Sequence, residues 1–220
     1  MSTVIPLNEM VDRYKKLYVP AVADVLDSLG LWHQVMDAEI KPLRLTDKIA
    51  GVAFTALGRS ERSEDRSIRL GAKMVDHLSP HDIAVFDCAD DRTVGHWGEL
   101  LSNGAIARGA TGAVVDGGMR DTAAVLDLEF PVFHRFRLPR DAKGRWNVVD
   151  MQQRVVCGGV PVSPGDFIVG DCDGVVVVPR ELATEVLIES ETTVKVESEI
   201  RDRVRAGENV GDLYMTYDRF

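Results

Sequence analysis

Residues 95–121 read GHWGELLSNGAIARGATGAVVDGGMRD. Within this stretch, Gly98 precedes apolar residues at helical spacing, which predicts a helix of about three turns that begins at Glu99. The first backbone amides of a helix have no partner inside it, and together with the helix dipole they attract anions. The amides of Leu100 and Leu101 therefore form a candidate binding site for a carboxylate or a phosphate.

A buried strand and a turn follow this helix. Residues 113–115 are apolar and few, which is typical of an inner strand. The Asp-Gly-Gly sequence at 116–118 then predicts a tight turn at the carboxyl end of that strand, where open α/β sheets bind their ligands. The stretch predicts a layered α/β fold, with Arg120 and Asp121 emerging at its ligand-binding edge.

Two interpretations of the adjacent Arg120 and Asp121 remain open. Asp121 precedes residues 122–126 and can cap a short helix, with Arg120 in solvent. Alternatively, Arg120 offers a planar fork to a carboxylate or enolate oxygen, and Asp121 offers a hard oxygen ligand to a divalent cation. One carboxylate binds Mg²⁺ weakly, so waters and substrate oxygens would complete the coordination shell. Glu99, in the first helical turn, is then a candidate for orienting a metal-bound water.

Composition bounds the class of protein. The chain has 220 residues, which favours a single domain, and 26 basic and 35 acidic residues give it a formal charge of -9. Such a chain lacks the basic stripe that a nucleic-acid backbone requires, so we expect no nucleic-acid binding. No run approaches the ~20 apolar residues of a membrane span, and the N-terminus lacks the apolar core of a signal peptide. Three cysteines without metal-ligand spacing, Cys88, Cys157 and Cys172, predict buried, reduced thiols in a cytoplasmic protein.

Outside the central stretch, residue patterns predict further helices and strands. Helices are expected at 8–18 and 19–29 with a break near Pro20, at 68–78, and over the long polar segment 179–205; strands are expected at 49–57, 131–135 and, several of them, 155–178. An internal echo links residues 79–89, SPHDIAVFDCA, with residues 163–173, SPGDFIVGDCD. Both halves predict a Ser-Pro turn followed by a short buried strand. His96 has no sequence partner that resembles a catalytic triad.

Several ordered motifs resemble those of the RraA-like family. They are WGELL at 97–101, the run GAxARGATGAVVDGGxRD at 104–121, PVF at 131–133, GGVxVxPGD at 158–166 and DxDGVVVVP at 171–179. This family includes the regulator of ribonuclease E activity and the class II 4-hydroxy-4-methyl-2-oxoglutarate / 4-carboxy-4-hydroxy-2-oxoadipate aldolases. The resemblance covers most of residues 20–215 and implies a swivelling β/β/α layered domain.

The resemblance also implies an assembly and a shared site. Members form trimers and hexamers, and a carboxylate from the C-terminal region of one subunit reaches the site of its neighbour. By this resemblance Glu197 is the expected carboxylate and Glu199 the reserve, and the N-terminal helices (about 7–30) and the C-terminal segment (about 180–220) are expected at subunit interfaces. One departure stands out: in the aldolases a second acidic residue follows the Arg-Asp pair, whereas this chain has Ala124.

Together these features predict a lyase that cleaves a carbon–carbon bond of a small 2-oxo acid with the help of Mg²⁺ or Mn²⁺. The substrate carboxylate is expected at Gly98, Leu100 and Leu101, the cation at Asp121, and the developing pyruvate enolate at Arg120. Because of Ala124, we expect oxaloacetate decarboxylation to be retained better than aldol cleavage. The alternatives are a non-catalytic, protein-binding regulator of the ribonuclease-inhibitor type, and an enzyme on this scaffold with an unrelated substrate.

Overall fold

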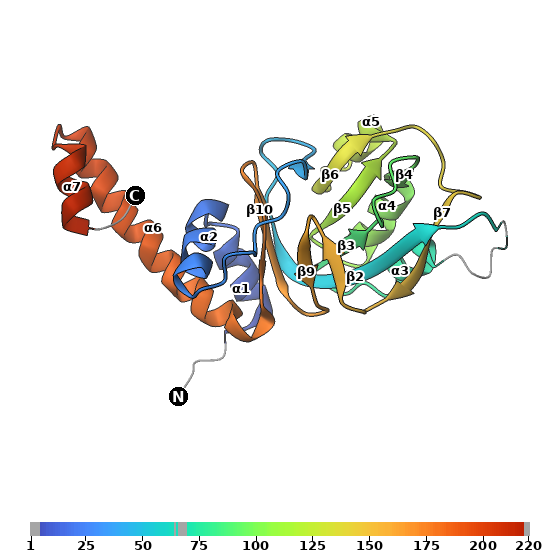
Figure 1. Ribbon diagram of the computed structural model, residues 1–220, viewed down its shortest axis with the longest axis horizontal. Coiled ribbons are helices and arrows are strands. Elements are labelled where there is room, and N and C mark those ends of the chain that lie inside the picture. Colours follow the sequence, from blue (N-terminus) through green and yellow to red (C-terminus); the bar gives the residue numbers. More distant parts are fainter. Residues whose placement is uncertain (1–4, 64, 66–69, 218–220) are drawn as a thin grey trace.

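The computed structural model describes residues 5–63, 65 and 70–217. Its centre is a strongly curved mixed sheet in the order β1-β6-β5-β3-β2-β10-β11, with β4 paired to β5 and β7 paired to β2 (Figure 1). The strands are β1 Lys41–Pro42, β2 Ile49–Ser60, β3 Asp82–Asp87, β4 Gly95–Trp97, β5 Gly112–Met119, β6 Val132–Arg137, β7 Trp146–Met151, β10 Phe167–Asp171 and β11 Gly174–Val178. A separate hairpin joins β8 Val155–Cys157 to β9 Val160–Val162. This arrangement confirms the predicted α/β fold class.

The middle of the sheet is parallel, as expected where helices connect successive strands. Strands β2, β3, β5 and β6 run parallel in adjacent pairs. The connecting helices are α3 Gly71–Asp76, α4 Glu99–Ala107 and α5 Thr122–Asp127. Parallel strands present their carboxyl ends at one edge of the sheet, so β5 delivers Arg120 and Asp121 to that edge.

A second layer of helices lies against the antiparallel end of the sheet. It consists of α1 Leu7–Tyr14, α2 Val19–Ser28 and α6 Ala183–Arg205, followed by α7 Val210–Tyr217. Side chains of the first three helices pack on β10 and β11 in one apolar cluster, which includes Tyr14 stacked on Phe167. Beyond this contact α6 leaves the body of the molecule and carries α7 at its far end (Figure 1). No helix in the described part of the chain combines the length and the apolarity needed to cross a bilayer.

The Ser-Pro echo proves to be one turn used on both sides of β2. The amide of Ser79 donates to Asp82 Oδ2, and the amide of Ser163 donates to Asp166 Oδ2, both at 2.7 Å. Each turn starts a strand that pairs with β2, one parallel and one antiparallel, and both pairings include Val52. The repeated sequence therefore fixes two neighbours of the same central strand.

Four expectations need correction. The first helix ends at Tyr14 rather than at residue 18, so the expected break lies at residues 15–18, just before α2, whose first turn holds Pro20, where a missing amide costs nothing. The tight turn at 116–118 is wrong, because β5 continues through these residues with an irregular register toward β6. Cys172 is exposed, whereas Cys88 and Cys157 are buried as expected, and burial raises the pKa of both buried thiols. The helix expected at 68–78 is α3, shorter than expected, and residues 68–69 lie outside the described residues.

The buried His134 on β6 should make folding sensitive to acid. Burial, and next the charge of Arg137, lowers the pKa of His134 from 6.5 to about 4. The unfolded chain therefore binds more protons than the folded chain between these pH values. The free energy of unfolding is then highest above about pH 6.5 and falls as the pH drops toward 4, by roughly 3 kcal/mol in total.

Urea unfolding at a series of pH values between 7 and 4 measures this loss. In His134→Leu the loss between pH 6.5 and 4 should shrink, because the imidazole that titrates is gone. In His33→Leu, which removes an exposed histidine, it should persist. An unchanged pH profile in His134→Leu would contradict the assignment.

Candidate active site

A cavity of about 350 Å³ lies at the carboxyl ends of the parallel strands. It is lined by five residues that the sequence predicted as a site: Gly98, Leu100, Leu101, Arg120 and Asp121. The N-terminus of α4 and the end of β5 meet in this cavity. Residues that the sequence grouped as one site therefore form two walls of a single cavity.

Local packing fixes the start of α4. The indole of Trp97, which is buried, donates to Ser102 Oγ at 2.8 Å, and the Ser102 hydroxyl donates to the carbonyl of Gly98 at 3.1 Å. The amide of Ser102 also donates to the Gly98 carbonyl, which closes the first helical turn. The amides of Leu100 and Leu101 precede this first closed turn, so they belong to the set that a helix leaves for an outside acceptor.

Asp121 does not act as the helix cap that the plain interpretation required. It precedes α5 with a left-handed backbone, φ 55°, which an aspartate tolerates better than most residues. Its side chain makes no capping bond to α5; instead Oδ2 accepts a long hydrogen bond from the amide of Glu99 at 3.4 Å. The Arg120 Nε atom lies 3.5 Å from the same oxygen. Asp121 thus links the end of β5 to the start of α4.

The missing side chain of Gly98 leaves room beside Asp121. A Cβ atom on Gly98 would lie 2.6 Å from Asp121 Oδ2 and 3.2 Å from Arg120 Cγ. The carboxylate is 42% exposed, and its two neighbouring donors lie at 3.4 and 3.5 Å. A hard oxygen donor that is partly exposed to solvent and weakly held by its neighbours fits a divalent cation that keeps most of its own waters.

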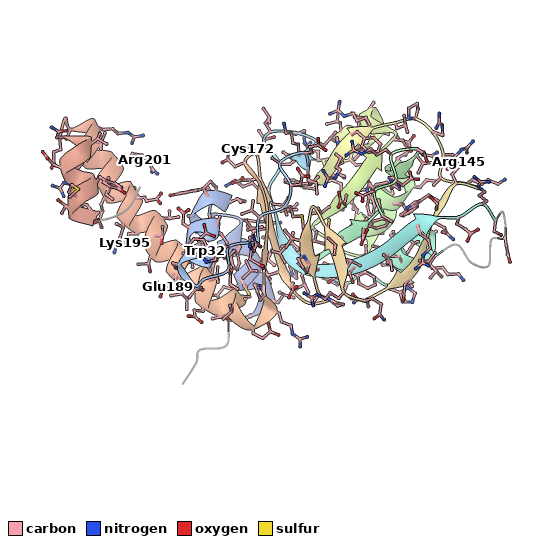
Figure 2. All side chains as sticks on the ribbon, in the orientation of Figure 1. Trp32, Arg145, Cys172, Glu189, Lys195 and Arg201 are labelled. Carbon is pink, nitrogen blue, oxygen red and sulfur yellow. The ribbon has the colours of Figure 1, made fainter. Side chains whose placement is uncertain are left out.

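Two predicted carboxylates lie outside the cavity. The Glu99 side chain is exposed and does not line it, so only the backbone of Glu99 takes part in the site. Glu197 lies on α6, where it accepts a hydrogen bond from the Tyr18 hydroxyl. Lys195 and Arg201 flank it on this helix and lie at the opposite end of the molecule from Arg145, which is on the loop beside the cavity (Figure 2). One chain therefore does not bring Glu197 to Arg120.

The opposite wall comes from residues 138–148, for which the sequence predicts no site residue. Residues 138–145 carry Asp141 and Lys143 into the cavity lining, and β7 adds Trp146 and Asn147. Asp141 Oδ1 lies 3.1 Å from Arg120 Nη1. The only signal in the sequence was an acid and a base two residues apart in a charged loop, which does not distinguish a cavity wall from a solvated surface.

His96 on β4 is one of the residues that line the cavity. Its side chain is fully buried, Nδ1 accepts the amide of Gly118 at 3.0 Å, and Nε2 lies 3.3 Å from Asp91 Oδ1. Burial lowers the pKa of His96, while the charge of Asp91 opposes that shift. The neutral ring therefore joins β4 to β5, and the partner that the sequence lacked is Asp91. A Cβ on Gly117 would lie 2.6 Å from Nδ1, so this glycine serves close approach rather than a turn.

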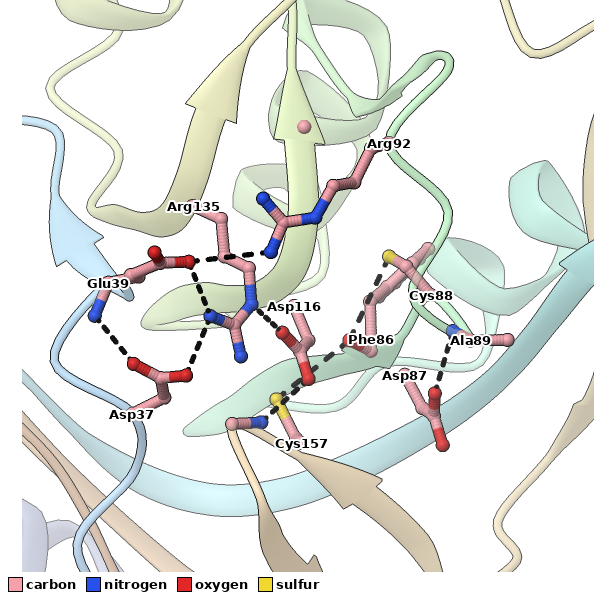
Figure 3. A network of polar contacts seen from close by, with 12 residues as sticks. Asp37, Glu39, Phe86, Asp87, Cys88, Ala89, Arg92, Asp116, Arg135 and Cys157 are labelled. Carbon is pink, nitrogen blue, oxygen red and sulfur yellow. Dashed lines mark hydrogen bonds and ion pairs between the residues drawn. The ribbon is translucent and has the colours of Figure 1, made fainter.

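A polar network holds β5 just before the site (Figure 3). Asp116 accepts a hydrogen bond from Nε of Arg135 and one of 2.7 Å from the amide of Gly158. The Arg135 Nη1 atom also donates to Asp37 and Glu39 at 3.0 and 3.1 Å. Burial alone would lower the pKa of Arg135, but these carboxylates raise it above its usual value. Three segments distant in sequence are thereby tied to the strand that carries Arg120.

Comparisons with known proteins agree with this geometry. The family model described as RraA-like: Aldolase/RraA matches residues 19–177. A Halalkalibacterium halodurans protein named "Putative 4-hydroxy-4-methyl-2-oxoglutarate aldolase" is 32% identical over 195 residues, which are 89% of this chain and 88% of that protein.

Solved structures are similar over nearly the whole chain. An uncharacterized protein from Pseudomonas syringae is 28% identical with a TM-score of 0.86, covering 99% of this chain and 100% of the other. A Streptomyces coelicolor protein, described as an unusual member of the RNase ES inhibitor RraA protein family, is 25% identical with a TM-score of 0.80, covering 90% and 98%. From the matched family model, the Halalkalibacterium halodurans relative and the shared fold, we conclude that the chain belongs to the RraA-like family.

Proposed function

We propose that the chain is a lyase that depends on a divalent cation and cleaves a carbon–carbon bond of a small 2-oxo acid through a pyruvate enolate. Its reactions would be aldol cleavage, oxaloacetate decarboxylation or both. The observation that carries this proposal is the convergence of Arg120, Asp121 and the first amides of α4 on one cavity. The name of the Halalkalibacterium halodurans relative supports the same class of substrate.

In this proposal the protein first fixes the 2-oxo acid end of the substrate. The C1 carboxylate would accept hydrogen bonds from the amides of Leu100 and Leu101, where the helix dipole favours negative charge. Arg120 would donate to the oxygen on C2, which becomes the enolate oxygen when the bond at C3 breaks. A donor aimed at charge that develops only in the transition state lowers the barrier rather than merely tightening binding.

Asp121 would hold the cation, Mg²⁺ or Mn²⁺, which supplies Lewis-acid polarisation of the 2-oxo group. On the far side of the cavity, Lys143 would face the distal end of the substrate. The positively charged ammonium group of a lysine there suits a 2-oxo acid with a second carboxylate, such as 4-hydroxy-4-methyl-2-oxoglutarate or oxaloacetate.

Removal of the cation tests the proposal. Pyruvate release from oxaloacetate and from 4-hydroxy-4-methyl-2-oxoglutarate should require Mg²⁺ or Mn²⁺, stop after chelation and return when the cation is restored. A lactate dehydrogenase assay measures the pyruvate, with metal-only samples as the control for spontaneous decarboxylation. Full turnover after exhaustive chelation would remove the cation from the mechanism.

We further propose that the protein assembles as a trimer or a hexamer. The arm formed by α6 and α7 leaves the body of the chain (Figure 1) and exposes large apolar side chains, among them Met215 at 82% and Val210 at 49%. Exposed apolar surface of this kind favours burial against another chain. In such an assembly Glu197 or Glu199 of one chain would approach the cavity of another.

Sedimentation at micromolar concentration tests the assembly. The native chain should sediment as a trimer or a multiple of one, and Met215→Glu should shift it toward the monomer. Ser60→Glu adds the same charge at an exposed polar position outside the segments expected at subunit interfaces and should leave the assembly intact. A native monomer would exclude a site shared between chains.

The second candidate function is a protein-binding regulator without chemistry. It is favoured by the likeness to the Streptomyces coelicolor member of the RNase ES inhibitor RraA protein family. The acidic surface of this chain would suit a basic segment of a partner protein. Cation-dependent pyruvate release decides between the two functions, because a regulator requires none.

A further inference from the structure

The cavity has a second carboxylate that the proposed function leaves without a role. Among the residues that the structure describes, two acids line the cavity, Asp121 and Asp141. If Asp121 holds the cation, its oxygens are not available as a base. Among the side chains of the same chain that line the cavity, Asp141 then remains as the acid that faces the substrate.

The loop that carries Asp141 is fixed at both ends. Near its start, the amide of Leu138 donates to the carbonyl of Met119, and the amide of Gly95 donates to the carbonyl of Arg140, both at 2.9 Å. At its end, the amides of Arg145 and Trp146 both donate to the carbonyl of Ala142 at 3.0 Å. A residue held this way keeps a constant place relative to β5, as catalytic groups require.

Position 124 does not offer an alternative. Ala124 lies on α5, and no residue of α5 lines the cavity. Ala124 is therefore not among the residues that surround the cavity, and it carries no group that could move a proton. Asp141 approaches from the opposite wall, and its Oδ1 atom lies 3.1 Å from Arg120 Nη1. An ion pair of this length requires the carboxylate form, which is the form that accepts a proton.

We propose that Asp141 is the general base and acid of aldol cleavage in this cavity, in place of an acid at position 124. This assignment rests on the proposed function. The substrate's C2 oxygen and C4 hydroxyl are close to each other in a 4-hydroxy-2-oxo acid. A C2 oxygen at Arg120 therefore brings the hydroxyl to the carboxylate that already contacts Arg120.

The proton balance closes without a co-reactant. Asp141 takes the proton of the C4 hydroxyl, the C4–O bond becomes a carbonyl and the C3–C4 bond breaks. The electron pair of that bond forms the C2–C3 double bond of the enolate, whose charge lies on the C2 oxygen beside Arg120. The protonated Asp141 then gives the same proton to C3, which yields pyruvate and restores the carboxylate.

Decarboxylation of oxaloacetate separates this role from a structural one. In decarboxylation the C3–C4 bond breaks and the C4 carboxylate departs as carbon dioxide, so there is no hydroxyl proton to remove, and the enolate can take a proton from water at C3. Asp141→Asn keeps an oxygen that can accept a hydrogen bond from Arg120 but cannot take a proton. It should lower kcat for cleavage of 4-hydroxy-4-methyl-2-oxoglutarate by about 10² to 10⁴ and leave oxaloacetate decarboxylation within a few-fold.

A third measurement does not depend on the aldol substrate. Proton NMR in D₂O follows exchange of the pyruvate methyl protons, which requires a base at C3. Asp141→Asn should slow this exchange as much as it slows aldol cleavage, and Asp141→Glu should restore part of both. Asp127→Asn removes an exposed acid of α5 outside the cavity and should change none of the three rates.

Each other result counts against Asp141. An equal loss of cleavage and decarboxylation would mean that Asp141 only orients Arg120. A lower KM with unchanged kcat would mean that Asp141 competes with the substrate carboxylate. Unchanged rates of cleavage and exchange would exclude the residue from proton transfer. A native protein that neither releases pyruvate from either substrate nor exchanges its methyl protons would overturn the proposed function itself.

Discussion

Replacing Arg120 by lysine is expected to lower kcat with oxaloacetate by about 10² to 10³, the usual effect of losing a preorganised donor to a developing oxyanion. Arg120 faces two carboxylates from different walls, with Nε 3.5 Å from Asp121 Oδ2 and Nη1 3.1 Å from Asp141 Oδ1. A planar guanidinium can keep both contacts and still donate to a substrate oxygen. The single ammonium of lysine cannot, although it keeps the charge.

Arg120→Ala should lose more in kcat/KM, because binding of the ground state is lost as well. Arg108→Lys is the matched control, because Arg108 also pairs with a carboxylate, Asp76 at 3.1 Å, but lies outside the cavity. Steady-state kinetics with thermal melts on all three variants separate catalysis from folding. If the Arg120 variants fold normally and turn over within a few-fold of the native chain, the proposed site is wrong and the regulator becomes the better hypothesis.

Local patterns in the sequence predicted many of the helices and strands. The helix from Glu99, the strand from Ile49 and the long C-terminal helix were predicted because each is set by residues within one segment. The Ser-Pro turns were predicted for the same reason. The continuation of β5 through Gly117 and Gly118 was missed. A side chain at these positions would collide with His96 of β4 and with the carbonyl of Val94 just before it, so the glycines are required by a segment distant in sequence rather than by a turn.

The candidate site likewise has one part that could be predicted from neighbouring residues and one part that could not. Residues 98–121 form two walls from one continuous stretch, so their spacing placed them together. The wall with Asp141 and Lys143 is separated from it in sequence by α5 and β6, and it meets Arg120 only because the loop is bonded to Met119 and Gly95. Contacts of this kind depend on the register of paired strands, which single-sequence patterns do not encode.

The largest expected effect on stability comes from Asp116, which lies four residues before Arg120 in the network of Figure 3. Asp116→Ala should lower the free energy of unfolding by about 3 kcal/mol, near the lower end for breaking a buried ion pair. The side chains of Asp116 and its partner Arg135 are only 13% and 12% exposed, so in the variant Arg135 would be left largely buried without its nearest carboxylate. Asp37 and Glu39 still face Arg135, which is why we do not expect the upper end of that range.

Urea denaturation of matched variants isolates this effect. Asp76→Ala breaks the exposed pair with Arg108 and should cost at most about 1 kcal/mol. The double variant Asp116→Ala, Arg135→Met should recover part of the stability lost in Asp116→Ala, because no charge is then buried without a partner. Equal stability of Asp116→Ala and Asp76→Ala would show that the network adds nothing beyond a surface pair.

The same variant tests how the fold supports the site. Asp116 also accepts the amide of Gly158, so its loss removes the side-chain link from β5 to the β8–β9 hairpin as well as the link to Arg135 on β6. Arg120 and Asp121 stand at the end of that strand, and a shift of about 1 Å in a catalytic group can cost about 10² in rate. Asp116→Ala should therefore lower kcat at temperatures where it is still folded, while the double variant, which also lacks Asp116, should regain stability without regaining the full rate.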